Sequence, residues 1–489
     1  MSEGFGRAVA RGFASVALGR AIGFVTNLVV AIVITRVLSP DEIGLVTIAT
    51  VCAGVAEVFG QIGLTRALVQ RDAIEPRHLV TAFWTDTSVG VGLALVFVAL
   101  APLIGLIYQD PRLIPLLAAL SLSFPLTALG KVHYARIQRE LRFADFTKAE
   151  VVSAVIAGTV AIIAVLSGLG VWAVVIRLLL QRALDSIAYY LYSRWVPWLA
   201  FDRDALADLL SFSLNLFGAE VFRYVASSID RLLMGGLFST DTLGYYSRAS
   251  ALVVQPLGQA MQAVVRVLFP ALSRVQSDHD TVRRTFIVVL GVLALGSFPI
   301  VVVLVALADD IIAVVLGERW LPAAGFVRVL APILVWNGLS RLSFTFYTSL
   351  GRADLTLRMT VITRLVLMAT TIAGIRWGPY GMAWGYLLGN AVGAVVQVVV
   401  ALRVIRLDAR AVARPLLEVG AATAVMALGV GLAAMASPPL AHGARLAAGA
   451  AVAVTAYGLG LLIVRPEPMR QVIRVVRRRR QRREPGTPT

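Results

Sequence analysis

Long apolar stretches recur along the whole chain and are separated by short polar connections. A stretch of about 20 predominantly apolar residues is long enough to cross a bilayer as a helix, and with this window the pattern predicts about fourteen transmembrane helices. They are expected at residues 14–37, 43–64, 79–106, 112–133, 146–167, 168–193, 207–238, 241–265, 285–307, 323–350, 355–376, 379–402, 414–435 and 442–464.

One short motif occurs twice in these connections. Residues 38–45 read "LSPDEIGL" and residues 238–245 read "FSTDTLGY", so that Ser, Asp and Gly return after 200 positions. Each motif joins the first two helices of a six-helix block. Asp41 and Asp241 are expected to cap the helix that follows, because a side-chain oxygen there can accept from free backbone N–H groups.

A second, weaker similarity pairs "GLGVWAVV" at 168–175 with "GPYGMAWG" at 378–385, and each segment begins the last helix of its block. Since six is even, both blocks start on the same side of the membrane, which predicts a parallel repeat about an axis along the membrane normal. The expected fold is an all-α integral membrane protein with two six-helix lobes and a C-terminal helical hairpin. The predicted parts are residues 1–200, 201–406, 407–465 and a basic tail at 466–489.

Composition agrees with this fold. The chain is 58% hydrophobic and 15% charged, whereas soluble domains are about 25% charged, and its mean hydropathy is +0.81. The first apolar run is too long for a signal peptide and has no cleavage site, so the N-terminus is expected to be retained. A single cysteine, Cys52, and four scattered histidines predict no disulfide, no metal site and no metal-dependent or thiol-dependent enzyme.

The net charge of +17 is explained by its placement along the chain. With a cytoplasmic N-terminus, most basic residues fall in inner connections, and both termini are cytoplasmic. The tail "RVVRRRRQRREPGTPT" is expected to contact anionic lipid headgroups, and nucleic acid is not an expected partner. The outer connections hold Arg36, Arg112, Arg319, Arg376 and Arg445.

Charged residues inside the apolar stretches are the candidates for function, because each costs about 2.5–3.5 kcal/mol at the bilayer centre. In 207–238 five polar residues share one helix face, and the 200-residue offset places Arg20 and Asn27 on the matching face of 14–37. Two such faces predict a central cleft. The five residues are Glu220, Arg223, Ser227, Asp230 and Arg231.

Further charges lie in other stretches. Arg177, Arg182 and Asp185 are interpreted as a structural bracket or as side chains that reach the inner interface. Glu220 with Arg223 at i,i+3 stays open as a structural pair, as do Glu57 and Asp86 as partners of Arg20. The predicted substrate-binding residues are Arg20, Asn27, Arg223, Ser227, Arg231, Arg248 and Arg341, and the predicted ion-coupling residues are Glu57, Asp86, Glu220 and Asp230.

The excess of arginine over acid predicts an anionic substrate. Guanidinium stays charged when buried and binds phosphate through two parallel hydrogen bonds. Serine and asparagine on the same faces suit a hydroxyl-rich headgroup. The expected ligand is therefore a phosphate or pyrophosphate that carries sugars, with no resident cofactor.

Several stretches together resemble Wzx-type polysaccharide flippases of the multidrug/oligosaccharidyl-lipid/polysaccharide exporter superfamily, in the branch that exports colanic and teichuronic acid units. The resemblance covers about residues 10–405. It is carried by "ITRVLSPDEIGLVTIATVCAGVAEVFGQIGLTRALVQR" (34–71), "RELRFADFTKAE" (139–150), "LSFSLNLFGAEVFRYVASSIDRLLMG" (210–235), "LGYYSRASALVVQPLGQAMQAVVRVLFPALSRVQSD" (243–278) and "LGERWLPAAGFVRVLAPIL" (316–334).

The resemblance implies two lobes that open alternately and move an undecaprenyl-pyrophosphate-linked oligosaccharide from the cytoplasmic to the outer leaflet of a bacterial plasma membrane. Coupling to a proton or sodium gradient through the acidic residues is a further hypothesis, and polysaccharide polymerase machinery is an expected partner. Two other transporters remain open as alternatives, a cation/drug antiporter of the same superfamily and a flippase for the peptidoglycan precursor. A membrane polymerase or ligase is a weaker alternative, because the outer connections are short.

Overall fold

The helical prediction is confirmed by a computed structural model that describes residues 3–60, 64–71, 74–436 and 441–470. These residues form α-helices and two short 3-10 helices, and no strand occurs among them. Ten helical stretches of the described chain are long and apolar enough to cross a membrane, and the longest of them, Asp354–Ile405 with 52 residues, contains two long α-helices. The chain is therefore a multi-pass membrane protein, and the count of fourteen stays a prediction.

The chain divides into two compact units, Met1–Gly244 and Tyr245–Thr489. The first unit contains α1 (Glu3–Val37), α2 (Pro40–Phe59), α3 (Leu64–Gln70), α4 (Pro76–Ile107), α5 (Leu113–Ser121), α6 (Ser123–Arg139), α7 (Phe143–Leu166), α8 (Trp172–Ser193) and α9 (Arg203–Leu237).

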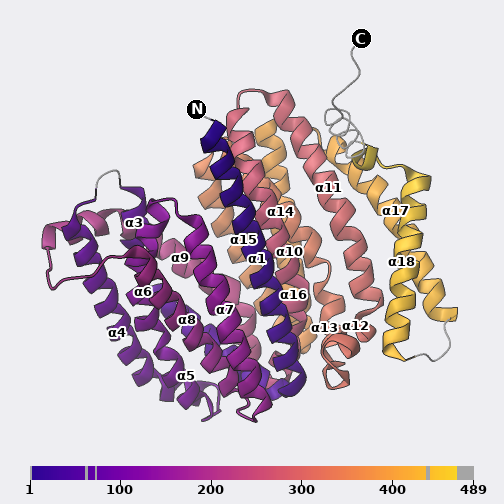
Figure 1. Ribbon diagram of the computed structural model, residues 1–489. Helices are drawn as coiled ribbons and strands as arrows, with labels where there is room; N and C mark the ends of the chain where they lie inside the picture. The colour runs from indigo at the N-terminus through magenta and orange to yellow at the C-terminus, as the bar shows by residue number, and fades with distance from the viewer. Residues whose placement is uncertain (1–2, 61–63, 72–73, 437–440, 471–489) are drawn as a thin grey trace. The chain divides into compact units, whose positions relative to one another are not determined.

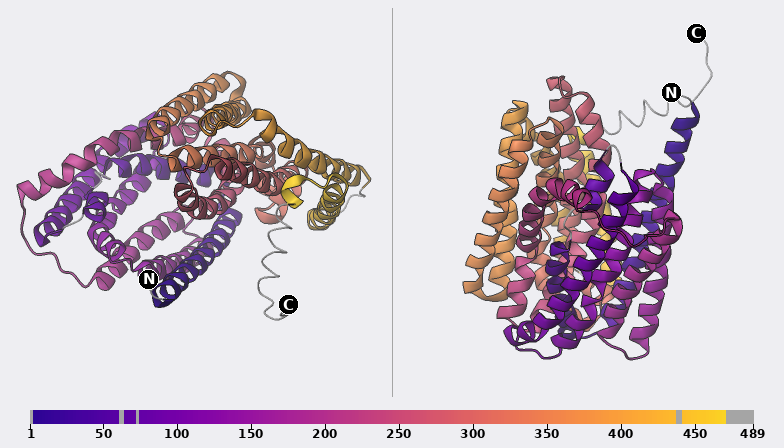
Figure 2. Two further views of the ribbon diagram at one scale, coloured as in Figure 1. Left: turned by 90° about the horizontal axis from the view of Figure 1, so that it is seen from above. Right: turned by 90° about the vertical axis from the view of Figure 1, so that its left-hand side faces the viewer.

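Helices of the first unit run up and down beside one another and are joined by short connections (Figures 1 and 2). α7 packs between α1 and α8, α8 packs on α6, and α4 packs on α5 and α6. α2 lies against α5 and α9. Small residues allow close approach between helices, as where Gly130 of α6 meets Ser186 of α8.

α9 packs within the first unit although the repeat assigns it to the second lobe. It contacts α2, α3 and α4. The connection before it is also tied to α4, because the indole of Trp84 donates to the carbonyl of Trp198 at 2.8 Å and the backbone N–H of Asp202 donates to Thr81 at 3.1 Å. The boundary by packing is at Gly244, and the predicted sequence boundary after residue 200 stays a prediction.

α10 (Thr240–Arg274) begins at the end of the first unit, and the remaining helices belong to the second. There α15 packs on α16, α17 on α18, and α11 on both α14 and α17. The side chain of Asp310 accepts from Arg445 at 2.8 Å and lies 2.7 Å from His442, which fixes α18 to α12. These helices are α11 (His279–Ala306), α12 (Ala308–Val315), α13 (Ala323–Leu330), α14 (Ile333–Ser349), α15 (Ala353–Gly374), α16 (Gly378–Ile405), α17 (Ala409–Ala436) and α18 (His442–Val464), with 3-10 helices η1 (Glu318–Trp320) and η2 (Ile375–Trp377).

The two repeated motifs form corners, which we call the first corner (residues 38–45) and the second corner (residues 238–244). The prediction that Asp41 caps α2 is wrong, because the cap is Ser39. Its hydroxyl accepts from the N–H of Glu42 at 3.2 Å, and the Glu42 carboxylate accepts from the N–H of Ser39 at 2.7 Å, a capping box. Ser239 likewise accepts from Thr242 at 3.3 Å, so the cap role expected for Asp241 belongs to Ser239.

The two corners pack on each other reciprocally. A Cβ atom on Gly44 would lie 1.9 Å from the carbonyl oxygen of Thr240, and a Cβ atom on Gly244 would lie 2.0 Å from the carbonyl oxygen of Pro40. Adding 200 to the residue of the first corner and subtracting 200 from the residue of the second corner converts one contact into the other, as a local two-fold relation requires. Only glycine allows this approach of backbone to backbone. The repeat over whole lobes stays a prediction.

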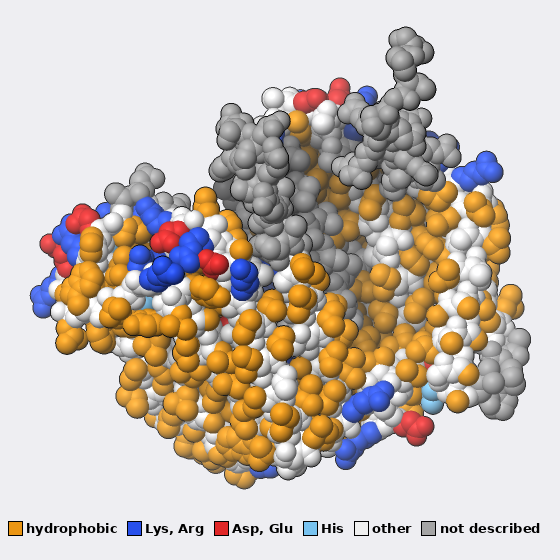
Figure 3. All heavy atoms as spheres, in the orientation of Figure 1, with side chains coloured by type: hydrophobic (Ala, Val, Ile, Leu, Met, Phe, Trp, Pro, Cys, Tyr) orange, Lys and Arg blue, Asp and Glu red, His pale blue; other side chains and the backbone are white. Residues whose placement is uncertain are grey.

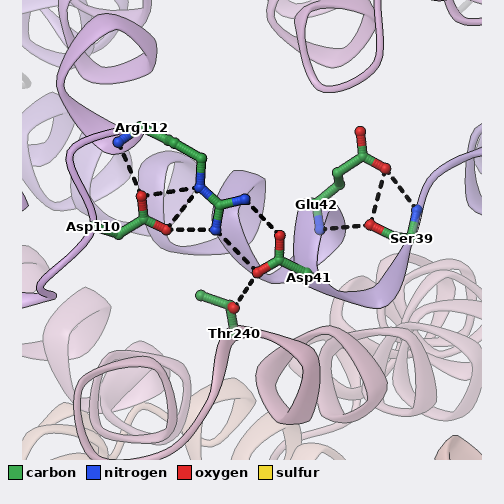
Figure 4. A network of polar contacts seen from close by, with 6 residues as sticks. All are labelled: Ser39, Asp41, Glu42, Asp110, Arg112 and Thr240. Carbon is green, nitrogen blue, oxygen red and sulfur yellow. Dashed lines mark hydrogen bonds and ion pairs between the residues drawn. The ribbon is translucent and has the colours of Figure 1, made fainter.

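Asp41 does not cap α2 and instead connects the two corners to Arg112, at the N-terminal end of α5 (Figure 4). It accepts from the hydroxyl of Thr240 and from Arg112, whose Nη1 lies 2.7 Å from Oδ2. Arg112 also binds Asp110 at 2.7 Å, and these hydrogen bonds hold the pKa of Asp110 below its usual range. The guanidinium of Arg112 thus forms ion pairs with the carboxylates of both Asp41 and Asp110.

The surface of the first unit is divided by polarity (Figure 3). Hydrophobic side chains cover its sides, and charged side chains gather at the end where α3 lies in Figure 1. Exposed residues at this end are paired: Arg71 with Asp208 at 3.0 Å and Arg77 with Glu75 at 2.8 Å. Apolar sides and a charged end are expected for a helical protein whose sides are surrounded by a bilayer.

The corner contact predicts unequal effects for three matched glycine substitutions. Gly44→Ala and Gly244→Ala each force a methyl group onto a carbonyl oxygen, and we expect each to destabilise the protein by about 1–3 kcal/mol. Gly92→Ala is the control, since a Cβ atom there meets nothing within 4 Å and alanine favours a helix. Thermal unfolding of the purified proteins measures the difference. Equal unfolding midpoints for all three would contradict the contact.

Candidate functional site

Three half-buried charged side chains of the first unit lie on α8, which has polar contacts with α1 and α2. α7 lies between α1 and α8 over most of its length, but polar side chains of α8 reach both α1 and α2. α8 carries Arg177, Arg182 and Asp185 within an otherwise apolar helix. We call these residues and their polar partners the α8 cluster.

Arg177 has an amide partner rather than an acid. Its Nη2 donates to the side-chain oxygen of Asn27 on α1, and its Nε is buried without a hydrogen-bond partner in the structure. Among the described residues, no carboxylate forms an ion pair with it. The side chain is half-buried and Asn27 is exposed. This guanidinium therefore has donors available for an anion.

Arg182, by contrast, is neutralised. Its Nη2 lies 3.4 Å from the carboxylate of Glu57 on α2, and Asp185 follows one turn later on α8. Asp185 also has the hydroxyl of Ser153 as a partner, while its Oδ1 is buried with no hydrogen bond. The interpretation of Arg182 and Asp185 as a structural bracket fits this geometry.

Arg20 lies on the same helix as Asn27, two turns earlier. It is exposed and faces Glu150 of α7, which is also hydrogen-bonded by Tyr189 of α8. Two turns of α-helix span about 10.5 Å. Arg20 and Arg177 therefore present positive charge at two levels of the α1 and α8 surface.

The predicted polar face of α9 has mixed environments. Glu220 and Arg223 form an i,i+3 pair with Nε 3.0 Å from Oε2, which was the structural alternative for these residues. Ser227 donates to the carbonyl of Tyr224 within its own helix at 2.9 Å. Asp230 is 1% exposed, and Arg231 lies 3.9 Å from it and is half-buried.

The remaining predicted residues lie elsewhere. Arg248 on α10 is half-buried and Arg341 on α14 is exposed, and both belong to the second unit. Glu57 joins the α8 cluster, whereas Asp86 on α4 is 2% exposed and has Lys131 of α6 as its cation. Neither Glu57 nor Asp86 pairs with Arg20 in a contact of the described structure.

Within the described part of the chain, no group of three or more His, Cys, Asp or Glu side chains could hold a metal ion. The polar groups of the α8 cluster can bind and position an anion and can exchange protons, and they include no activated nucleophile.

Two candidate residues were missed in the sequence, Arg177 as a candidate anion site and Lys131 as the partner of Asp86. A signal for Arg177 was present, because the residues one turn away on either side are Ala173, Val174, Leu180 and Gln181 and none is acidic. Arg182 has Asp185 at i+3, so its own helix can neutralise it. No local signal connects Lys131 with Asp86, since they lie on different helices.

The fold is that of a membrane transporter. The lipid II flippase MurJ, in an inward closed conformation, is similar over 93% of this chain and 99% of that chain, with a TM-score of 0.73 and 13% sequence identity. An inward-facing multidrug resistance transporter of the MATE family covers 78% of this chain and 94% of its own, with a TM-score of 0.58 and 14% identity. At these identities the similarity concerns the fold alone.

Residues 33–325, more than half of the chain, match the polysaccharide biosynthesis protein family, and the protein belongs to that family. The teichuronic acid biosynthesis protein TuaB of Bacillus subtilis is 28% identical over 383 residues, covering 77% of this chain and 79% of its own. The lipopolysaccharide biosynthesis protein WzxC of Escherichia coli is 24% identical over 375 residues, or 76% of each chain. These relatives confirm the resemblance to the Wzx-type branch.

Proposed function

We propose that this protein flips an undecaprenyl-pyrophosphate-linked oligosaccharide repeat unit from the cytoplasmic to the outer leaflet, for the synthesis of a cell-surface polysaccharide. Its family and the names of its relatives TuaB and WzxC support this substrate class. Flipping breaks no covalent bond, so the protein works as a transporter and not as an enzyme. Polysaccharide polymerase machinery would then receive the flipped unit.

The observation that carries the proposal is the unneutralised guanidinium of Arg177. Keeping a cation within a transmembrane helix without an acid is costly unless an anion or water meets it. A pyrophosphate offers oxygens that accept from a guanidinium in pairs. Asn27 orients the fork of Arg177 from one side, which leaves its other donors for the lipid headgroup.

Alternating access assigns roles to the other cations. In our proposal Arg20 and Arg177 receive the pyrophosphate, and Arg223, Arg231, Arg248 and Arg341 contribute as the cleft changes its opening. Asn27 and Ser227 contact sugars. A proton or sodium ion that binds one conformation more tightly biases the exchange, and Glu57, Asp86, Glu220 and Asp230 are the residues proposed for it.

The proposed location is a bacterial plasma membrane with both termini in the cytoplasm. The charged end of the first unit, with Arg71 and Arg77, then faces the cytoplasm, in agreement with the excess of basic residues that cytoplasmic loops carry. The two corners face outward.

Loss of the protein should cause its substrate to accumulate. In depleted cells we expect a complete repeat unit on undecaprenyl pyrophosphate, because assembly continues on the inner leaflet while export stops. Mass spectrometry of extracted lipids measures the accumulation, and protection from glycosidase added to spheroplasts assigns the leaflet. Accumulated units that the glycosidase cleaves would place the defect after flipping and contradict the proposal.

Replacement of Arg177 should reduce export without loss of the protein. A hydrogen bond to a charged group contributes about 1.5–3 kcal/mol, so Arg177→Gln is expected to lower export roughly 10-fold to 100-fold. Arg177→Lys should fall between, because it keeps the charge but not the planar fork. Export is measured as surface polysaccharide per membrane-inserted protein.

Arg352→Gln is the matched control for this series. Arg352 lies in the connection before α15 and pairs with Asp354 at 3.0 Å, so its loss leaves the α8 cluster intact. Wild-type export by Arg177→Gln would remove Arg177 from substrate binding.

Single cysteines should report the proposed orientation. In a Cys52→Ala parent, Leu199→Cys lies in the connection before α9 and Met435→Cys at the end of α17, where the native side chains are 86% and 87% exposed. A membrane-impermeant maleimide should label position 435 in intact spheroplasts and position 199 only after lysis. The reverse pattern would invert the topology.

A further inference from the structure

Asp86 is a deeply buried acid that substrate binding does not use. It lies on α4, its side chain is 2% exposed, and its Oδ2 has no hydrogen-bond partner in the structure. A buried carboxylate normally has several hydrogen bonds or a close cation, since its desolvation is expensive. Asp86 has neither on Oδ2.

Its cation is shared with another acceptor. The Nζ of Lys131 on α6 lies 3.8 Å from Oδ1 of Asp86, too far for a hydrogen bond. The same Nζ donates at 2.8 Å to the carbonyl of Gly60, which ends α2. A helix C-terminus carries partial negative charge, so Lys131 stands between two competing acceptors.

The other charges on the neighbouring helices have partners of their own. Glu57 of α2 binds Arg182, Asp208 of α9 binds Arg71 of α3 and lies 3.7 Å from His78 of α4, and His133 of α6 bonds Ser193. Arg136 of α6 lies over the ring of Trp195, and the described α5 contains no charged residue. Lys131 is the charged group that acts on Asp86.

We propose that Asp86 is a proton-binding site and that its protonation state moves Lys131 between Asp86 and the end of α2. A proton from water enters at Oδ2 and converts the carboxylate to a neutral carboxyl group. The ammonium then loses its attraction to Asp86 and binds the Gly60 carbonyl alone. When the proton leaves, the carboxylate draws Lys131 away from Gly60.

This exchange reaches the α8 cluster through α2. Glu57 lies one turn before Gly60 and forms the ion pair with Arg182. A change in the contact between Lys131 and the C-terminal end of α2 therefore affects the helix that carries Glu57. Proton control of transport rests on the proposed flipping function, whereas proton binding at Asp86 does not.

Infrared spectroscopy of the full-length protein in lipid nanodiscs tests proton binding without any substrate. A pH titration should reveal the carbonyl stretch of a protonated carboxylic acid that Asp86→Asn removes. Asp145→Asn is the control and should keep the band, since Asp145 pairs with Arg142 at 2.7 Å and is not part of this site. Survival of the band in Asp86→Asn would overturn the proposal.

Lys131→Gln supplies the second measurement, and it keeps Asp86 in place should Asp86→Asn unfold. Removing a positive charge disfavours the carboxylate, so the acid should hold its proton to higher pH and the midpoint should rise by about one pH unit or more. An unmoved midpoint would refute the coupling to Lys131. Replacing choline by sodium at constant ionic strength should leave the midpoint unchanged, and a sodium-dependent midpoint would replace the proton by sodium and overturn the proposal.

The two proposals fail in different ways. A cell that accumulates no lipid-linked repeat unit would reject flipping, while the Asp86 band and its response to Lys131 would stand. Conversely, normal flipping with no titrating band would reject the proton site alone.

Discussion

A charge inside an apolar helix must find a countercharge, a dipole or water, and the first unit is organised around this constraint. The energetic cost is about 2.5–3.5 kcal/mol for each unpaired charge even on the lenient scale. α2 and α8 are tied by Glu57 and Arg182, and α4 and α6 by Asp86 and Lys131. Each pair joins two helices that are not consecutive in the chain, so each neutralised charge also holds two helices together. Arg177 departs from this rule, since its partner is the uncharged amide of Asn27.

The long apolar stretches were sufficient to predict an all-helical membrane protein, because hydrophobic length is a local property of the chain. The i,i+3 pairing of Glu220 with Arg223 is local as well, so the sequence suggested it as an alternative, and the structure contains this pair. Contacts between helices were not accessible in this way: nothing near Lys131 in the sequence indicates Asp86 or Gly60. The cap was misassigned because Asp41 and Ser39 both suit an N-terminus, and the structure places Ser39 at the cap, in a capping box with Glu42, and Asp41 inside the first turn, where it binds Arg112.

Helix α8 carries one arginine that has a carboxylate partner and one that does not. Arg182 is held by Glu57 and serves packing, while Arg177, five residues away, keeps hydrogen-bond donors unused. Burial alone would not separate them, since both side chains are half-buried. The distinction lies in what faces each guanidinium. The missing countercharge therefore distinguishes Arg177 from Arg182, which burial and the number of charges do not.

The reciprocal contact of the corners has a consequence for how the chain can change. Each glycine lies against a backbone oxygen, and the side chain of the residue that supplies this oxygen takes no part in the contact. Pro40 and Thr240 accordingly differ while Gly44 and Gly244 are the same. In a symmetric dimer of one six-helix chain, any mutation at this contact would occur twice. In a fused chain the two halves can differ, as they do at Pro40 and Thr240, whose main-chain atoms lie nearest to the two glycines.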